Sequence, residues 1–221
     1  MKRYIIFDLD GTLVDSLPGI AEGVNRALRA LGLPEHSPGE VRGMIGSGAA
    51  NLCAKALGYP DAEHTPPDKL EALHSIFRKE YPTCWQGEYT VPYPWIANML
   101  TLLSAEGAQL AVLSNKPHDV TYPMVKELFA HIPFSFIMGY TGKFPRKPAP
   151  DAIYHMAKEW GVNTADITLV GDSLFDARTA KNAGCKTALV AWGYANVTEL
   201  AAWQAPLFGS VDELCSYLLQ S

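Results

Sequence analysis

The sequence predicts an α/β fold, with a Rossmann-like parallel sheet as its core and an inserted α-helical domain. From about residue 86 onward, short apolar runs of strand length alternate with amphipathic runs of helical spacing. This alternation is typical of a parallel sheet that is covered by helices on both faces. Residues 16–85 carry helical spacing without a convincing strand. We therefore expect a core made of residues 1–15 and 86–221 and a helical insert made of residues 16–85.

Local patterns define the first strand and the helices of the insert. The run from Arg3 to Leu9 is apolar, with β-branched and aromatic members, and predicts a buried strand. Pro18 suits the first turn of the helix that follows, and Gly32 suits its end. The helices predicted on such grounds in the insert cover residues 18–31, 38–45, 49–57 and 68–81.

The remaining elements follow from the same two periodicities. In the first helix after the insert, Ile96, Met99 and Leu103 fall on one face, and Gly107 marks the end. Helices are predicted at residues 94–105, 117–129, 150–160, 174–183, 197–203 and 211–219. Strands are predicted at residues 109–114, 134–138, 167–170 and 186–191.

Composition narrows the class of protein. The chain has 221 residues, of which 48% are hydrophobic, and a formal net charge of -5. This is enough apolar material for a sizeable core, and the acidic balance argues against a nucleic-acid partner. The first apolar run stops at Asp8, too early for a secretory leader, and no other run approaches the length of a membrane span. We expect a cytoplasmic monomer or homodimer without a membrane or nucleic-acid partner.

Polar residues follow several of the predicted strands. In an open parallel sheet, ligands bind at the carboxyl ends of the strands. The sequence therefore predicts a single site built from separate segments. Its candidate residues are Asp8, Asp10, Gly11 and Thr12 after the first strand, Ser114 and Asn115 after the second, Lys147 in a loop, and Asp172, Ser173 and Asp176 after a later strand.

Two acids at the end of the first strand indicate a metal site. Asp8 and Asp10 are two residues apart, so an extended chain places both side chains on the same side. Acids at a buried strand end are costly unless a cation compensates them. Asp172 completes a set of hard oxygen ligands that suits Mg²⁺. The plainer alternative is that Asp10 and Gly11 form only a turn.

With Mg²⁺ held by Asp8, Asp10 and Asp172, the residues support phosphoryl transfer. Asp8 is the expected nucleophile and forms an aspartyl-phosphate. Asp10 is the expected proton donor to the leaving group and the later base for water. The residues expected to contact the phosphoryl group are Gly11, Thr12, Ser114, Asn115 and Lys147. Asp176 is expected to orient Lys147 or a metal-bound water, with Ser173 in support.

The chain resembles the haloacid dehalogenase superfamily. Residues 8–12 match its D-x-D-G-T motif, and Ser114, Lys147 and the G-D-S-x-x-D run of residues 171–176 follow in the family's order. The resemblance implies a Rossmann-like core and a Mg²⁺ ion bound by the carboxylates of Asp8 and Asp172 and the backbone carbonyl of Asp10. It also implies that the insert is a mobile helical cap of the first type.

Further stretches are similar to phosphoglycolate phosphatases: residues 42–48, 93–94, 114–117, 147–150 and 192–194. Dehalogenases lack the carboxylate matching Asp10, because a halide leaving group needs no proton. The resemblance thus favours hydrolysis of a small phosphate monoester, with 2-phosphoglycolate as the candidate substrate. Alternatives within the superfamily are a phosphosugar mutase, a pyrophosphatase and a nucleotidase.

A loop in the insert is a candidate for reading the leaving group. Arg42 precedes Gly46-Ser47-Gly48, which opens a helix, and helix N-termini attract anions. We hypothesise that this loop closes over the site and binds a carboxylate of the substrate. The alternative is a flexible turn with a solvated arginine.

A non-enzymatic rival is a receiver-type signalling domain, which also uses an aspartyl-phosphate and Mg²⁺. Its acceptor aspartate lies on an internal strand, whereas Asp8 lies on the first strand. A receiver domain also has no helical insert of this size. The sequence therefore favours the enzyme.

Overall fold

The computed structural model describes residues 2–220, and the chain forms two compact units. One unit combines the chain up to Val14 with the chain from Pro92 onward, and the other is Asp15–Val91. The second boundary lies six residues after the predicted one. The reason is that η1 (Gly87–Tyr89) contacts α1 (Leu17–Ala30) and so belongs with the helical unit.

The first unit contains a six-stranded sheet in the order β5-β4-β1-β6-β7-β8. Each neighbouring pair of strands is parallel, which confirms the predicted α/β fold. The strands are β1 (Tyr4–Phe7), β4 (Gln109–Pro117), β5 (Phe136–Tyr140), β6 (Ile167–Gly171), β7 (Lys186–Val190) and β8 (Leu207–Phe208).

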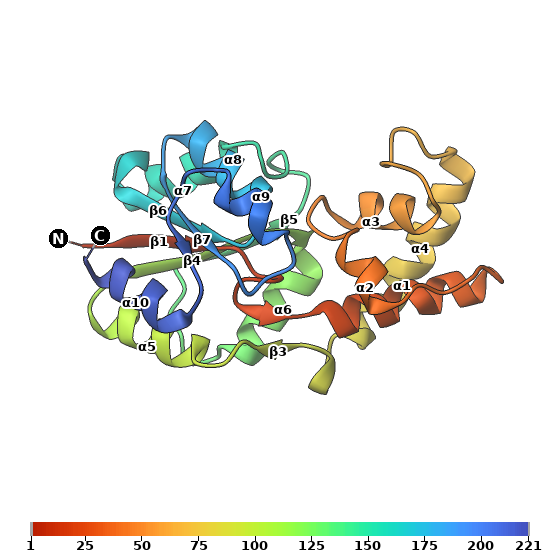
Figure 1. Cartoon of the computed structure of the whole chain (residues 1–221), viewed down its shortest axis with the longest axis horizontal. Helices are drawn as coiled ribbons and strands as arrows, with labels where there is room; N and C mark the ends of the chain where they lie inside the picture. The colour runs from red at the N-terminus through yellow and green to blue at the C-terminus, as the bar shows by residue number, and fades with distance from the viewer. Residues whose placement is uncertain (1, 221) are drawn as a thin grey trace. The chain divides into compact units, whose positions relative to one another are not determined.

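Helices cover both faces of this sheet. Figure 1 shows α5 (Ile96–Ala105) and α10 (Val211–Gln220) on one face and α7 (Asp151–Trp160) and α8 (Leu174–Ala183) on the other. Ile6 of β1 and Leu169 of β6 pack in one buried cluster with Ile153 of α7. The side chains of Phe7 and Val170, which alternate with these along β1 and β6, are also fully buried, so both sides of the central strands are apolar. The remaining elements of this unit are α6 (His118–Leu128), η2 (Thr164–Asp166) and α9 (Val197–Ala201).

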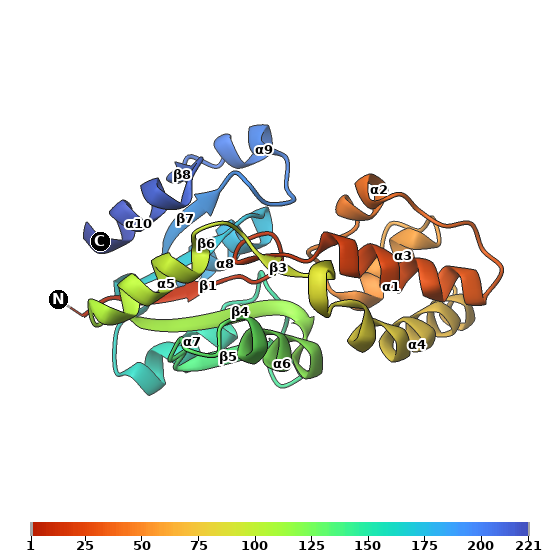
Figure 2. The same ribbon diagram turned by 90° about the horizontal axis from the view of Figure 1, so that it is seen from below.

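The second unit is built from helices. They are α1, α2 (Pro38–Arg42), α3 (Ala49–Ala56) and α4 (Pro67–Cys84). Figure 2 shows α1 alongside α4, and the two approach closely at Gly23, where an added Cβ would lie 2.9 Å from Tyr81 Cδ2. In α4 the rings of Phe77 and Tyr81 stack, with centroids 5.0 Å apart.

Several element ends differ from the prediction. β4 continues three residues further, to Pro117, and α4 runs through Pro82 to Cys84. The two-residue strands β2 (Val14–Asp15), β3 (Val91–Pro92) and β8 were not predicted, because two residues carry no readable periodicity. β2 and β3 pair with each other where the chain passes between the units. None of the helices within residues 2–220 combines the length and apolar character needed to cross a membrane.

Candidate active site

The central strand β1 pairs with β4 on one side and with β6 on the other, and its last residue is in register with a residue of each. Phe7 is paired with Val112 of β4 and with Val170 of β6, and the N–H of Asp8 donates to the carbonyl of Val170 at 2.8 Å. The carboxyl ends of the three strands therefore meet at one edge of the sheet. The buried polar residues near this edge are Asp8, Thr12, Ser114, Asn115, Lys116, Lys147, Asp172 and Asp176.

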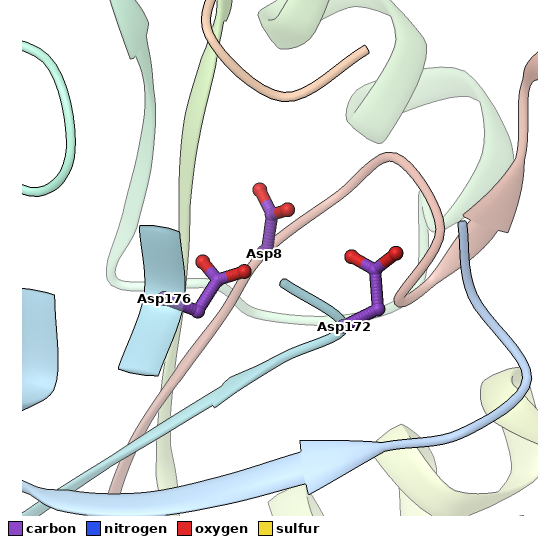
Figure 3. Close-up of side chains that lie close together, drawn as sticks. All are labelled: Asp8, Asp172 and Asp176. Carbon is purple, nitrogen blue, oxygen red and sulfur yellow. The ribbon is translucent and has the colours of Figure 1, made fainter. Parts of the chain in front are cut away.

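Three carboxylates lie close together here. Figure 3 shows Asp8 after β1, Asp172 after β6 and Asp176 in the first turn of α8, and one oxygen from each lies within 4.8 Å of the others. The ammonium of Lys147 lies 2.8 Å from Asp8 Oδ1 and donates to Asp176 Oδ1 at 2.6 Å. Three buried acids thus share a single close lysine.

Burial sets the protonation of this cluster. It raises the pKa of Asp8 to about 8, with further repulsion from Asp176 and Asp172, although Lys147 opposes the rise. Burial and the Asp176 charge raise the pKa of Asp172 to about 7. Burial alone lowers the pKa of Lys147, but Asp176 and Asp8 outweigh it and hold that pKa above its ordinary value. Among the described residues, the ammonium of Lys147 alone does not balance the charges of Asp8, Asp172 and Asp176.

The turn after β1 is shaped around Asp172. Gly11 has a φ of +81°, and a Cβ there would lie 2.3 Å from Asp172 Oδ2, so only glycine fits. The hydroxyl of Thr12 donates to Asp172 Oδ1 at 3.2 Å. The phosphate contact of Thr12 stays a prediction, and its hydroxyl here supports the carboxylate of Asp172.

A second loop also holds Asp172, and the sequence did not reveal it. The N–H of Tyr194 donates to Asp172 Oδ2 at 2.6 Å. A Cβ on Gly193 would lie 2.2 Å from Asp172 Cβ, so this loop approaches the aspartate closely. Trp192 Nε1 donates to the carbonyl of Thr12 at 3.2 Å and joins the two loops. The available sequence signals were the similarity of residues 192–194 to phosphoglycolate phosphatases and a glycine between aromatic residues just after a strand.

Asn115 fixes the backbone of Lys147. Its Oδ1 accepts from the Lys147 N–H at 2.8 Å, and its Nδ2 donates to the Lys147 carbonyl at 3.0 Å. The phosphate contact of Asn115 stays a prediction, and this geometry also makes Asn115 a positioning residue for the lysine. Ser114 is buried at the same strand end, and its Oγ accepts from the Lys116 N–H at 3.3 Å.

Lys116 was missed as a site residue. Its ammonium donates to both carboxylate oxygens of Asp10, at 2.8 and 3.1 Å. The two residues are 106 positions apart, so no local pattern links them. A lysine two residues after Ser114, at the end of an otherwise apolar strand, was the available signal. The contact orients the carboxylate that is proposed to move protons.

Asp176 and Ser173 form a capping box at the start of α8. The Ser173 hydroxyl donates to Asp176 Oδ2, and the Asp176 N–H donates back to Ser173 Oγ at 3.4 Å. Asp176 Oδ1 faces Lys147, so both oxygens of this carboxylate already have partners. A Cβ on Gly171 would lie 2.1 Å from Asp176 Cγ, which leaves the carboxylate little freedom.

Arg42 lies in the helical unit. It is exposed in the last turn of α2, and Gly46 and Gly48 have φ values of +113° and +93°. Gly48 is the N-cap of α3 and offers no side chain to the free N–H groups of its first turn. These backbone conformations require glycine and leave donors open at the helix start.

The first unit's carboxylates fit a divalent cation. The donors are hard oxygens, which Mg²⁺ prefers. Asp8 Oδ1 is buried and makes no hydrogen bond of good geometry, although Lys147 lies beside it. Burial has also raised two of the pKa values, and a bound cation reverses such a rise. The residues present are therefore able to hold a metal.

Comparison with known families agrees with this geometry. The profile of the haloacid dehalogenase-like hydrolases matches residues 5–190. The chain belongs to this family. The match covers the loop of residues 8–12, Ser114, Lys147 and the Asp172–Asp176 turn, so the predicted resemblance is confirmed.

The individual proteins to which the chain is similar include phosphatases. The chain is 34% identical over 230 residues to the phosphoglycolate phosphatase of Escherichia coli K12, covering 96% of this chain and 90% of that protein. It is 32% identical to the phosphoglycolate phosphatase of Chromobacterium violaceum, covering 90% of both chains. A crystal structure described as a predicted phosphoglycolate phosphatase from Haemophilus somnus matches with a TM-score of 0.88 at 29% identity, covering 98% and 97%. The prediction of a phosphatase of the haloacid dehalogenase-like family is confirmed at this level.

Proposed function

We propose that this phosphatase hydrolyses a small phosphate monoester with Mg²⁺ and an aspartyl-phosphate on Asp8. The observation that supports this most strongly is the buried cluster of Asp8, Lys147, Asp172 and Asp176 at the end of β1. Asp10 lies two residues beyond the nucleophile, on the same loop. Asp8 lies beside Lys147 and the proposed metal site, whereas Asp10 is held by Lys116. These different surroundings suit the two carboxylates to two different roles.

The two carboxylates divide the reaction between them. Asp8 attacks the phosphorus in line, the bond from phosphorus to the leaving oxygen breaks, and Asp10 gives that oxygen a proton. Asp10 then takes a proton from the water that attacks the aspartyl-phosphate, and phosphate leaves Asp8 free. Lys147 and the hydroxyl of Ser114 stabilise the charge on the phosphoryl oxygens. Asn115 keeps Lys147 in place, and Lys116 keeps Asp10 in place.

The residues proposed to hold Mg²⁺ are the carboxylates of Asp8 and Asp172 and the backbone carbonyl of Asp10. Asp176 is left out because Lys147 and Ser173 already occupy its oxygens. When bound, the cation neutralises charge on the phosphoryl group and keeps Asp8 ionised. Thr12 and the N–H of Tyr194 hold Asp172 in orientation for this role.

Phosphate release from a panel of esters tests the proposed function. The panel contains 2-phosphoglycolate, sugar phosphates, nucleoside monophosphates, pyrophosphate and an aryl phosphate, each with Mg²⁺ or EDTA. We expect turnover of at least one small ester with Mg²⁺ and a loss of roughly 100-fold or more in EDTA, restored by excess Mg²⁺. Circular dichroism in EDTA serves as the control for folding. Failure of every ester with Mg²⁺ would contradict the proposal, and phosphate moved between hydroxyls without release would indicate a mutase.

The candidate substrate is 2-phosphoglycolate, which the names of the relatives support. We propose that the helical unit acts as a cap and that Arg42, with the Gly46–Gly48 loop, binds the carboxylate of the leaving group. Arg42→Ala is then expected to lower kcat/KM for 2-phosphoglycolate by about 10- to 100-fold, the usual cost of a lost charged hydrogen bond. The aryl phosphate should be affected little, since it carries no carboxylate.

Arg78→Ala is the matched control for this measurement. Arg78 is also an exposed arginine of the helical unit, on α4. It should leave kcat/KM for both esters unchanged. If Arg42→Ala slows both esters equally, the loop does not read the leaving group.

A further inference from the structure

A pocket lies next to the candidate active site, entirely within the first unit, and shares Ser114, Asn115 and Lys147 with it. It has a volume of about 150 Å³. Its walls come from the end of β4, the first residue of α6, the end of β5, the loop that leads to Lys147 and the start of α7. This space is enough for a small molecule.

The charged side chains that line this pocket, those of Lys143, Arg146 and Lys147, are all positive. His118, Lys143, Arg146 and Lys147 lie on its walls, and none of its described lining residues is acidic. The chain as a whole has a net charge of -5, so this local excess runs against the overall balance. Lys147 is already paired with Asp8 and Asp176. Three basic side chains therefore remain for a ligand.

Arg146 is held in place without an acidic partner. Its guanidinium carbon lies 3.4 Å from the ring centroid of Tyr140, which also lines the pocket. Stacking of this kind uses the face of the guanidinium and leaves its edge for in-plane hydrogen bonds. Arg146 Nε is buried and has no hydrogen-bond partner among residues 2–220, and no carboxylate there forms an ion pair with the side chain. A half-buried, fixed and uncompensated guanidinium is suited to binding an anion.

His118 adds a directed donor. Its Nδ1 accepts a hydrogen bond from the Gly139 N–H at 3.3 Å, so the neutral ring carries its proton on Nε2. Lys143 is exposed at the rim, with its ammonium 5.1 Å from the ring centroid of Phe144. The pocket thus combines three cationic or donor groups with two aromatic side chains.

We propose that this pocket binds the acidic end of a small carboxylate molecule, with Arg146 as the main anion-binding residue. The carboxylate has two possible sources, which share this chemistry. It is either the acidic group of the enzyme's own substrate, in which case Arg146 binds that group in place of Arg42, or a separate small metabolite. Because the loop from Lys143 to Lys147 forms one wall, the ligand contacts the segment that carries the phosphate-binding lysine.

Calorimetric titration with malonate, a compact dicarboxylate, tests the binding site. We expect saturable binding to the protein in EDTA, without Mg²⁺, and a loss of affinity of about tenfold or more in Arg146→Gln. Lys143→Gln, at the exposed rim, should weaken binding by about two- to fivefold and keeps the test valid if the first variant is unstable. Arg178→Gln replaces an exposed arginine on α8 and should bind malonate like the wild type. This measurement needs no turnover and is independent of the proposed function.

Inhibition of aryl phosphate hydrolysis by malonate then separates the two sources, and this arm rests on the proposed function. A rise in KM alone that Arg146→Gln removes would assign the pocket to the acidic group of the substrate. A fall in kcat at constant KM that Arg146→Gln removes would assign it to a separate metabolite. Absence of saturable binding to the wild type, or equal affinity of the wild type and both pocket variants, would overturn the site.

Discussion

Asp8→Asn is expected to lower kcat for every ester by roughly four orders of magnitude or more, because the amide is not a nucleophile toward phosphorus. Asp8 lies at the end of the central strand, and Lys147 and Asp172 are already arranged around it. The remaining binding groups cannot replace the covalent step. Single-turnover measurements with an aryl phosphate check the result. Asp166→Asn, an exposed aspartate of the same unit, is the control and should keep the kcat of the wild type.

The same substitution should not destabilise the metal-free protein. Burial raises the pKa of Asp8 from 3.8 to about 8, so the folded state keeps a proton that the unfolded chain loses above about pH 4. The folded state then binds more protons across this window, and the stability of the metal-free wild type falls as the pH rises from 4 to 8. The asparagine side chain of the variant does not titrate, so the variant does not lose stability through this group as the pH rises.

Melting temperatures in EDTA and in Mg²⁺ measure this effect. In EDTA, the melting temperature of Asp8→Asn relative to the wild type should increase between pH 5 and pH 8. With Mg²⁺ the order should reverse, because binding of the cation stabilises the folded wild type and needs the ionised carboxylate. A variant that is inactive and also much less stable than the wild type at pH 8 in EDTA would mean that the lost activity reflects misfolding.

Motif spacing and strand order predicted which segments of the chain meet in this site, but not every side-chain contact within it. Asp8, Asp10 and Gly11 are adjacent on one strand end, so their spacing was sufficient to connect them. The parallel fold then explained why Asp172 joins them, since the ends of neighbouring strands in a parallel sheet meet at one edge. Residue types and strand order were enough to predict which residues come together at this edge of the sheet.

Orientation of the side chains was beyond the sequence. The hydroxyl of Thr12 and the amide of Asn115 have the same chemistry whether they bind phosphate or protein, and here their partners are Asp172 and the Lys147 backbone. The donor at position 194 is a backbone N–H, which every residue except proline carries. Lys116 pairs with Asp10 across 106 positions, and only the folded chain brings them together.

Asp10, whose carboxylate accepts hydrogen bonds from Lys116, is the second residue whose substitution should have a large effect. Asp10→Asn removes the proton donor and base but keeps a side chain of nearly the same shape. We expect kcat for an alkyl ester such as 2-phosphoglycolate to fall by about 10²- to 10⁴-fold, the usual share of general acid–base catalysis. An aryl phosphate should react differently, because a phenolate leaves without a proton.

Rapid-mixing measurements distinguish the two roles of Asp10. With the aryl phosphate, Asp10→Asn should release about one phenolate per enzyme in a fast burst, because the first step needs no acid. Turnover afterwards should be slow, since no base activates the water that attacks the phosphorylated Asp8. With the alkyl ester no burst is expected, because the first step is then slow as well. Equal slowing of both esters without a burst would contradict the proton-transfer role and indicate that Asp10 acts only through the structure of the loop.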